Sequence, residues 1–168
     1  ADMNTPESSP SGNVHGMPLA ACLGTGPEEL VEAVGGPSVR PANVVLIGIR
    51  NLDTREKEIV RGSGVRAYTM SEIDRRGVGP ILEEALAALR KSCGGLHLSL
   101  DLDGLDPEVA PGVGTPVLGG LSYREAHLLC EMVAETGRLR AVDAVEVNPT
   151  LDVRNRSKPV EVGRWWYP

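Results

Sequence analysis

Aromatic side chains are scarce in this chain, and phenylalanine is absent. The 168 residues contain only 3% aromatic residues, so an apolar core has to be built from Val, Leu, Ile and Ala. Hydrophobic residues still make up 41% of the chain and charged residues 24%, which is typical of a soluble globular protein. This length is enough for one domain with a sizeable core.

Cysteine is also sparse. Cys22, Cys93 and Cys130 are far apart, odd in number and form no CxxC pair, which argues against a disulfide framework or a zinc knuckle. We therefore expect a reducing, cytoplasmic location. No apolar run approaches the ~18 residues of a membrane span, and no signal-peptide pattern is present. The chain starts at Ala1 without a Met, so we expect its beginning to be missing.

Positive charge is in deficit. Lys and Arg number 17 against 23 Asp and Glu, and the formal net charge is −6. This balance argues against nucleic acid or an anionic membrane as the main partner. It does not identify a substrate.

Beyond a polar, Gly- and Pro-rich loop at residues 1–16, strand and helix patterns alternate. Thr25 and Glu28 have capping-box spacing and predict a helix that ends at Gly35 and Gly36. Ser122 and Glu125 predict a second such helix start. Apolar periodicity predicts a helix at 81–89 and strands at 43–49, 64–69, 96–101 and 141–147.

This alternation predicts a parallel sheet with helices packed on its faces. The continuous apolar run at 43–49 is typical of a strand buried on both faces. Ligand sites in such sheets lie at the carboxyl ends of the strands. The residues at or just past these ends are Asp53, Asp101, Asp103 and Glu146.

The carboxylate pair in residues 97–107, HLSLDLDGLDP, is the sharpest chemical feature. Asp101 and Asp103 are two apart on a strand, so we expect them to point to the same side. Two carboxylates about 5 Å apart repel by roughly 3 kcal/mol at an effective dielectric constant of 20. A bound cation removes that cost, and oxygen ligands suit Mg²⁺, Ca²⁺ or Mn²⁺. The alternative is an exposed loop in which Asp103 and Asp106 only form turns.

The N-terminal loop carries several short polar side chains. Asn and Ser groups with backbone amides can hold a carboxylate, and His15 can move protons near neutral pH. The alternative is a solvated turn region. The residues concerned are Asp2, Asn4, Ser11, Asn13 and His15.

Five segments together resemble the arginases of the ureohydrolase family. They are DMNTPESSPSGNVHGMPLA at 2–20, IGIRNLD at 47–53, SLDLDGLDP at 99–107, GVGTPVLGGLSYRE at 112–125 and EVNP at 146–149. They follow the family's order and spacing and cover the chain to about Ser157. DxDxxDP alone indicates the wider ureohydrolase group, whereas SGNxHG points to arginase.

The resemblance implies an α/β fold, a three-layer sandwich whose central, mostly parallel sheet is flanked by helices, incomplete in this chain. It implies hydrolysis of L-arginine to L-ornithine and urea, with a hydroxide between two Mn²⁺ ions attacking the guanidinium carbon. By motif position, Asp2, Asp101 and Asp103 are similar to metal ligands, with Asp101 bridging both ions.

The same resemblance suggests roles for the other polar residues. Glu146 is similar to the carboxylate that orients the guanidinium, His15 to the proton shuttle and Thr115 to a residue beside the metals. Asn4, Ser11 and Asn13 resemble the α-carboxylate contacts, and Asp53 with Glu56 the α-amino contact. Arg124 and Glu125 resemble an intersubunit ion pair of a homo-oligomer, a trimer or hexamer when complete. The alternative for this pair is a solvated helix start.

The resemblance is incomplete at both ends. Family members carry a further His, and an Asp-x-His pair, upstream of the position of Ala1. His97 and His127 do not fit these roles, because they fall in a strand and a helix. We expect residues 1–157 to form the C-terminal part of one arginase-like domain and 158–168 a divergent tail, either without a function of its own or acting as a docking patch.

Two other functions stay open at this point. A related ureohydrolase such as agmatinase acts on a substrate without the carboxylate, which would leave Asn4, Ser11 and Asn13 without a purpose. A non-catalytic fragment would act only through assembly or binding.

Overall fold

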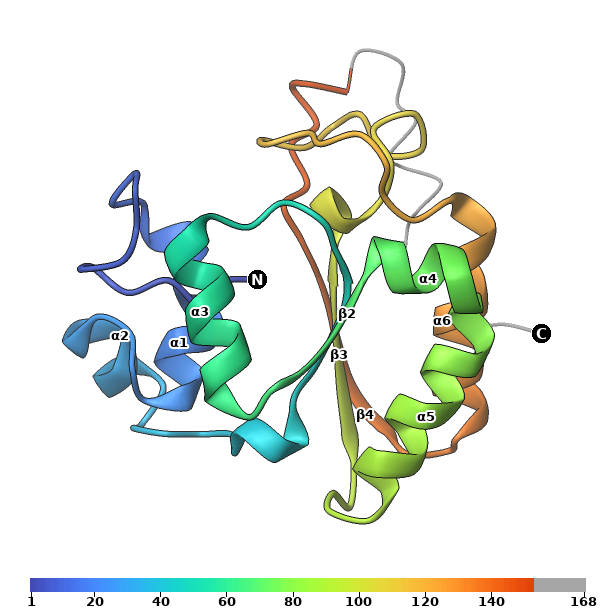
Figure 1. Ribbon diagram of the computed structural model, residues 1–168, viewed down its shortest axis with the longest axis horizontal. Helices are drawn as coiled ribbons and strands as arrows, with labels where there is room; N and C mark the ends of the chain where they lie inside the picture. The colour runs from blue at the N-terminus through green and yellow to red at the C-terminus, as the bar shows by residue number, and fades with distance from the viewer. Residues whose placement is uncertain (153–168) are drawn as a thin grey trace. The chain divides into compact units, whose positions relative to one another are not determined.

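The computed structural model describes residues 1–152, which form two compact units, residues 1–68 and the described part of residues 69–168. Figure 1 shows the elements of each unit. Within residues 1–152, none of the helices has the length and apolar character needed to cross a membrane. The predicted tail at 158–168 and the domain boundary at 157 lie outside the described residues.

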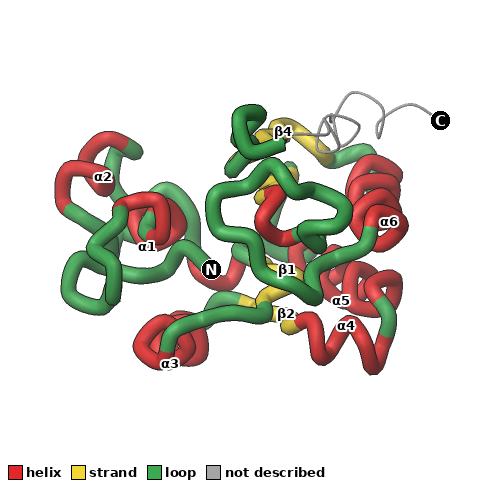
Figure 2. The backbone as a smooth tube through the Cα atoms, turned by 90° about the horizontal axis from the view of Figure 1, so that it is seen from above, coloured by secondary structure: helices red, strands yellow, loops and turns green. Residues whose placement is uncertain are grey.

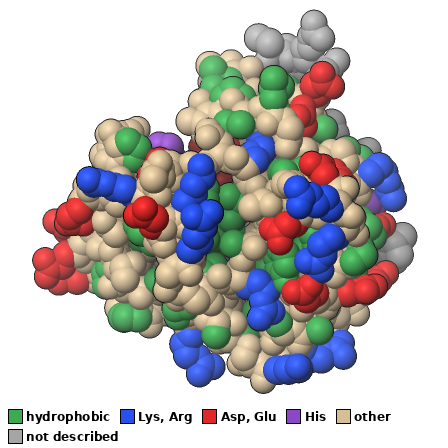
Figure 3. Space-filling model, viewed as in Figure 1, with side chains coloured by type: hydrophobic (Ala, Val, Ile, Leu, Met, Phe, Trp, Pro, Cys, Tyr) green, Lys and Arg blue, Asp and Glu red, His purple; other side chains and the backbone are tan. Residues whose placement is uncertain are grey.

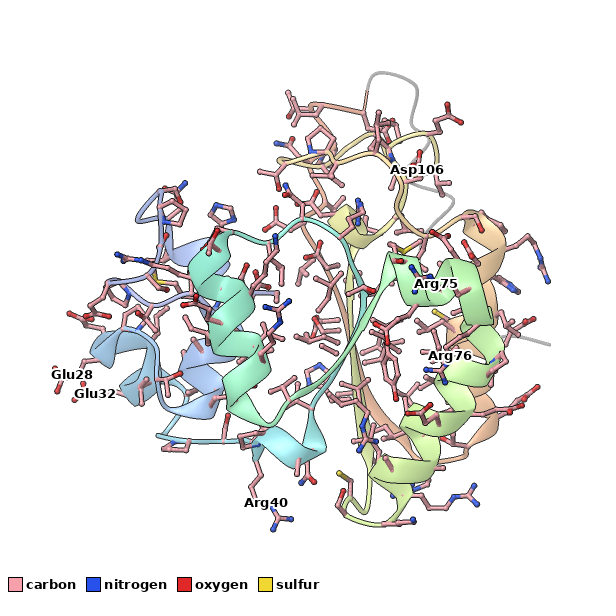
Figure 4. All side chains as sticks on the ribbon, viewed as in Figure 1. Glu28, Glu32, Arg40, Arg75, Arg76 and Asp106 are labelled. Carbon is pink, nitrogen blue, oxygen red and sulfur yellow. The ribbon has the colours of Figure 1, made fainter. Side chains whose placement is uncertain are left out.

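The first unit contains three α-helices and a two-stranded sheet in which β1 pairs with β2. The α-helices and strands, in chain order, are α1 (Pro18–Leu23), α2 (Glu28–Ala33), β1 (Val45–Ile49), α3 (Thr54–Ser63) and β2 (Arg66–Thr69). Short 3-10 turns, η1 (Val14–Gly16) and η2 (Pro41–Asn43), precede α1 and β1. In Figure 4, the labelled side chains of Glu28 and Glu32 on α2 extend away from the other helices of this unit.

The core of the first unit forms around Met3, which is 1% exposed. Met3 clusters with Val60 of α3 and with Val65, and partly buried side chains from α1, β1 and β2 pack against them. The N-terminal loop is therefore anchored in the core by an apolar residue that lies between two polar ones, Asp2 and Asn4.

The second unit combines helices with a parallel strand pair. Its elements are α4 (Met70–Arg76), α5 (Val78–Arg90), β3 (Leu96–Asp101), η3 (Leu102–Gly104), α6 (Tyr123–Glu135) and β4 (Leu139–Val145). Strands β3 and β4 run parallel, with Ser99 opposite Asp143 and Asp101 opposite Val145. Helix α5 packs against both α4 and α6, and Figures 1 and 2 show the three helices on one side of this sheet.

The period-two pattern of β3 explains that packing. Leu96 and Leu100 are buried, whereas His97 and Ser99 on the opposite face are exposed. The apolar stripe of α5 behaves as predicted, since Ile81, Leu82 and Ala85 are buried. The predicted α/β class, with parallel sheets flanked by helices, is confirmed.

Three local predictions were wrong. Thr25 does not start a helix, because its amide and hydroxyl both donate to the Ala20 carbonyl, at 2.9 and 3.3 Å, and so end α1. Helix α2 begins only after Pro27, with no side-chain cap. The residues of β1 are mostly half-buried, because β1 has one partner strand within its two-stranded sheet.

The third wrong prediction concerns Asp103, which is not part of the strand. Strand β3 ends at Asp101, and the chain turns at once into η3. The Asp101 carboxylate caps this turn by accepting a hydrogen bond from the Asp103 amide. The chain turns here because the short Asp101 side chain can accept a hydrogen bond from the backbone amide two residues further along the chain.

Candidate metal and substrate site

The two central carboxylates form a short hydrogen-bonded series at the end of β3. Asp101 Oδ1 accepts from the Asp103 amide at 2.8 Å, and Asp103 Oδ2 accepts from the Thr115 hydroxyl at 2.5 Å. Each carboxylate thus has one oxygen oriented by a donor of the protein. The structure brings together three residues that the sequence singles out.

Glu146 follows directly after β4 and has a left-handed backbone with φ of 61°. This conformation is uncommon for a residue with a side chain and is often found at functional sites. A Cβ placed on Gly114 would lie 3.6 Å from Glu146 Oε2, so this carboxylate sits beside the residue that precedes Thr115. The end of β4 and the loop that carries Thr115 therefore meet.

In the first unit, Asp2 also has a left-handed backbone, with φ of 58°. Its carbonyl accepts from the Ala20 amide at 3.0 Å. The next residue, Met3, donates its amide to Glu56 Oε1 at 3.1 Å, and Glu56 is only 6% exposed. Glu56 thus holds the backbone of Met3, the residue that follows Asp2.

Asn4, expected at the α-carboxylate, and Asp53, expected at the α-amino group, lie side by side in the first unit. The Asn4 amide group donates to Asp53 Oδ2 at 2.9 Å, and Asn4 is buried. Asp53 also caps α3, because its Oδ1 accepts from the Glu56 amide at 2.9 Å. These two hydrogen bonds lower the pKa of the Asp53 carboxyl, and the bond from Asn4 has the larger effect. Asp53 is therefore ionised over the neutral pH range.

The remaining loop residues are exposed. Ser11 Oγ accepts from the Asn13 amide at 3.2 Å, which brings these two expected carboxylate contacts together. His15 lies in η1 and is exposed, so its imidazole can exchange protons with solvent.

Ser8 is a contributor that the sequence did not indicate. Its hydroxyl donates to Asn4 Oδ1 at 2.7 Å and accepts from the Thr5 amide at 2.8 Å. Ser8 therefore orients Asn4 from the side opposite Asp53. Its four-residue spacing from Asn4, within a polar loop, is a signal too weak to separate Ser8 from the neighbouring Ser9.

A second polar cluster lies on the exposed face of β3 and β4. Asp143 accepts from the Ser99 hydroxyl at 2.6 Å and pairs with the His97 imidazole. As expected, His97 is within a strand and His127 within a helix, α6. Asp143 was not anticipated, because only the register of β3 against β4 places it beside Ser99.

At the start of α6, Glu125 takes part in a capping box. Its carboxylate accepts from the amide and the hydroxyl of Ser122, at 2.8 and 2.7 Å. Arg124 is exposed on the same turn. The helix-start interpretation of this pair is supported for Glu125, and the intersubunit role stays a prediction.

The donors at the end of β3 fit part of a site for a hard divalent cation, because Asp101 and Asp103 offer carboxylate oxygens. Within residues 1–152, no group of three or more His, Cys, Asp or Glu side chains converges as a metal cluster. Asp101 and Asp103 are therefore two possible ligands of such a site.

Comparison with known proteins identifies the family. The profile of the arginase family matches residues 1–162. The chain belongs to the arginase family. The arginase of Bacillus caldovelox is 55% identical over 163 residues, which cover 96% of this chain and 54% of that protein. Membership in the arginase family implies a dinuclear metal site.

Solved arginase structures agree with the fold. The native structure of Bacillus caldovelox arginase superposes with a TM-score of 0.95 at 52% identity, covering 100% of this chain and 57% of that one. Entamoeba histolytica arginase in complex with L-ornithine gives 0.88 at 35% identity, covering 95% and 53%. The chain thus spans about half the length of the arginases it matches.

Proposed function

We propose that this chain carries part of an arginase active site and serves the hydrolysis of L-arginine to L-ornithine and urea. The observation that carries the proposal is the series Asp101–Asp103–Thr115 at the end of β3, in a chain that belongs to the arginase family. A relative solved with L-ornithine supports the choice of product.

The proposed cofactor is a pair of Mn²⁺ ions, with Asp2, Asp101 and Asp103 among the residues that would hold them. Bound metal would supply a water nucleophile at neutral pH and stabilise developing charge. Asp103 has its Oδ2 oriented by Thr115, so its approach to a cation is set before binding. Preorganisation of this kind reduces the cost of ligand ordering.

The other polar residues would bind and orient the substrate. Glu146 would pair with the guanidinium, which a carboxylate can engage through two parallel hydrogen bonds. Asp53, ionised at neutral pH, would attract the α-amino group, with Glu56 supporting this region from its buried position. Asn4, Ser11 and Asn13 would face the α-carboxylate, and His15 would carry protons to and from solvent.

We further propose a cytoplasmic homo-oligomer, a trimer or hexamer when complete, with Arg124 at the contact.

On the face visible in Figure 3, Lys and Arg side chains are interspersed with Asp and Glu. This distribution suits a small-molecule substrate rather than a polyanion.

The experiment measures urea release from L-arginine and from agmatine, with and without Mn²⁺, using the chain alone and joined to the upstream half of a related arginase. We expect Mn²⁺-dependent release from L-arginine in the joined protein and a loss of at least about 100-fold in Asp101→Asn, because one ligand is removed. Asp74→Asn, with the same charge change on the exposed side of α4, is the matched control.

Substrate choice separates the remaining functions. A site built around a charged group rejects an analogue that lacks it by about 10⁴-fold or more. Comparable kcat/KM for agmatine would replace arginase with agmatinase. A joined protein that folds but releases no urea would favour the non-catalytic alternative.

A further inference from the structure

The loop between η3 and α6, residues 107–120, is closed at its base by Asp106. Asp106 Oδ2 accepts from the Gly119 amide at 2.9 Å, and the Asp106 amide donates to the Leu121 carbonyl at 2.9 Å. The Leu121 amide in turn donates to Gly104 at 3.0 Å, and Leu105 and Leu121 form a parallel bridge. Figure 4 labels Asp106 where this loop begins. Both ends of the loop are therefore joined at one residue.

Gly120 makes this junction possible. A Cβ on Gly120 would lie 2.4 Å from the Leu105 carbonyl carbon and 2.6 Å from the Asp106 nitrogen. These are backbone atoms, so a side chain could not be accommodated by a rotamer change. The two ends of the loop thus approach as closely as a glycine allows.

The loop carries groups to two parts of the candidate site. Thr115, near its middle, donates to Asp103, and the Gly112 carbonyl accepts from the Asn148 amide at 2.7 Å, two residues after Glu146. Ala110 and Val113 are 0% and 2% exposed, so the loop is packed as well as hydrogen-bonded. Its conformation decides whether the Thr115 hydroxyl reaches Asp103.

The two oxygens of Asp106 act in different ways. Oδ1 accepts from the Glu108 amide at 2.9 Å, which is a local turn bond. Oδ2 reaches across thirteen positions to Gly119. A turn-forming role needs only the first bond, so the second distinguishes a loop clamp from a simple turn. An asparagine has one acceptor oxygen and a donating NH₂ group, so it cannot present an acceptor at both the Oδ1 and the Oδ2 position.

We propose that Asp106 is a positioning residue that clamps the 107–120 loop, so that Thr115 holds Asp103 in the orientation that receives a divalent cation. Its effect on the cation rests on the proposed function, whereas its effect on Thr115 and Asp103 does not. The residue acts through Thr115 and does not itself contact substrate.

The first experiment uses NMR on the whole chain. In Asp106→Asn we expect the Gly119 amide to exchange about tenfold faster or more. We also expect the side-chain carboxyl resonance of Asp103 to move to its position in Thr115→Val, a variant that lacks the donating hydroxyl. Asp74→Asn should change neither signal. If Asp106→Asn does not fold, Asp106→Ser keeps an acceptor for Glu108 and is too short to reach Gly119.

The second experiment measures the Mn²⁺ affinity of the chain joined to the upstream half of a related arginase, from water proton relaxation in a double-mutant cycle. Asp106→Asn and Thr115→Val should each weaken binding about tenfold, and the double variant should weaken it no further, because both changes remove the same contact. The clamp would be overturned if, in folded Asp106→Asn, the Gly119 amide stays protected and the Asp103 resonance does not change. It would also be overturned if the two substitutions weaken Mn²⁺ affinity additively. If the joined protein shows no Mn²⁺ binding that depends on Asp101, the proposed function is overturned instead. The NMR result would then still decide the role of Asp106.

Discussion

Glu56 and Met3 are joined by a hydrogen bond of 3.1 Å from the Met3 amide to Glu56 Oε1, and both residues are buried. This contact links α3 to the segment between Asp2 and Asn4, although 53 positions separate the two residues. The placement of two expected site residues therefore depends on one buried carboxylate.

Replacing Glu56 with Ala should lower the free energy of unfolding by about 1–3 kcal/mol, because the buried Met3 amide loses its acceptor. Glu56→Gln keeps an acceptor oxygen and should cost clearly less. Urea denaturation followed by circular dichroism gives both values. Glu58→Ala on the exposed side of α3 is the control. Equal losses for Ala and Gln at position 56 would contradict this prediction.

Asp53 should make the stability depend on pH in the acid range. Its pKa is lowered from the ordinary value of 3.8, so its ionised form contributes stability that is fully present above that value. This contribution is lost as the pH falls through the lowered pKa, where the carboxyl becomes neutral. Asp53→Asn keeps a good helix cap. The difference between parent and variant should therefore be present at pH 6 and shrink below about pH 3.8. A difference that is constant with pH would contradict the prediction.

Gly120→Ala should destabilise the chain by about 1–3 kcal/mol or more, since the added Cβ overlaps backbone atoms. The matched control is Gly62→Ala in α3, where an added Cβ meets no atom within 4 Å outside its two chain neighbours. That change should be neutral or stabilise by up to about 1 kcal/mol, because alanine favours a helix. Thermal unfolding of the two variants side by side compares them directly.

Cys130 should resist alkylation in the folded chain. Burial, reinforced by the neighbouring Glu131, raises the pKa of its thiol to about 12, so almost none is thiolate at pH 8. Cys22 and Cys93 are partly exposed and should react first with iodoacetamide. Mass spectrometry of peptides before and after unfolding reads out each site. Early labelling of Cys130 would show that α6 opens readily.

Local sequence patterns predicted several elements well. Strand β3 spans residues 96–101, as expected, and the capping box of Ser122 and Glu125 marks the start of α6. These elements depend on neighbours within a few positions. Helix α3 was not predicted, although Asp53 and Glu56 have capping spacing, because its apolar face is narrow.

Residues at strand ends and the composition of the N-terminal loop selected most candidate site residues, whereas Thr115 and Glu56 came from the family resemblance alone. The family resemblance then assigned their expected roles, which stay predictions here. The contacts among them were not predictable, because a hydrogen bond such as Thr115 to Asp103 depends on how a fourteen-residue loop is closed. Loop closure is decided by distant packing rather than by the local pattern.

The sequence by itself determined the α/β class, the order of most strands and helices, and the family, since periodicity, capping and motifs are local properties of the chain. Tertiary structure alone decided that Glu56 is a buried support for Met3, that Asp143 joins Ser99 and His97, and that Asp106 clamps the loop of Thr115. The physical reason is the same in all three cases. A carboxylate takes whichever donors the packed backbone brings within about 3 Å, and those donors come from residues far away in sequence.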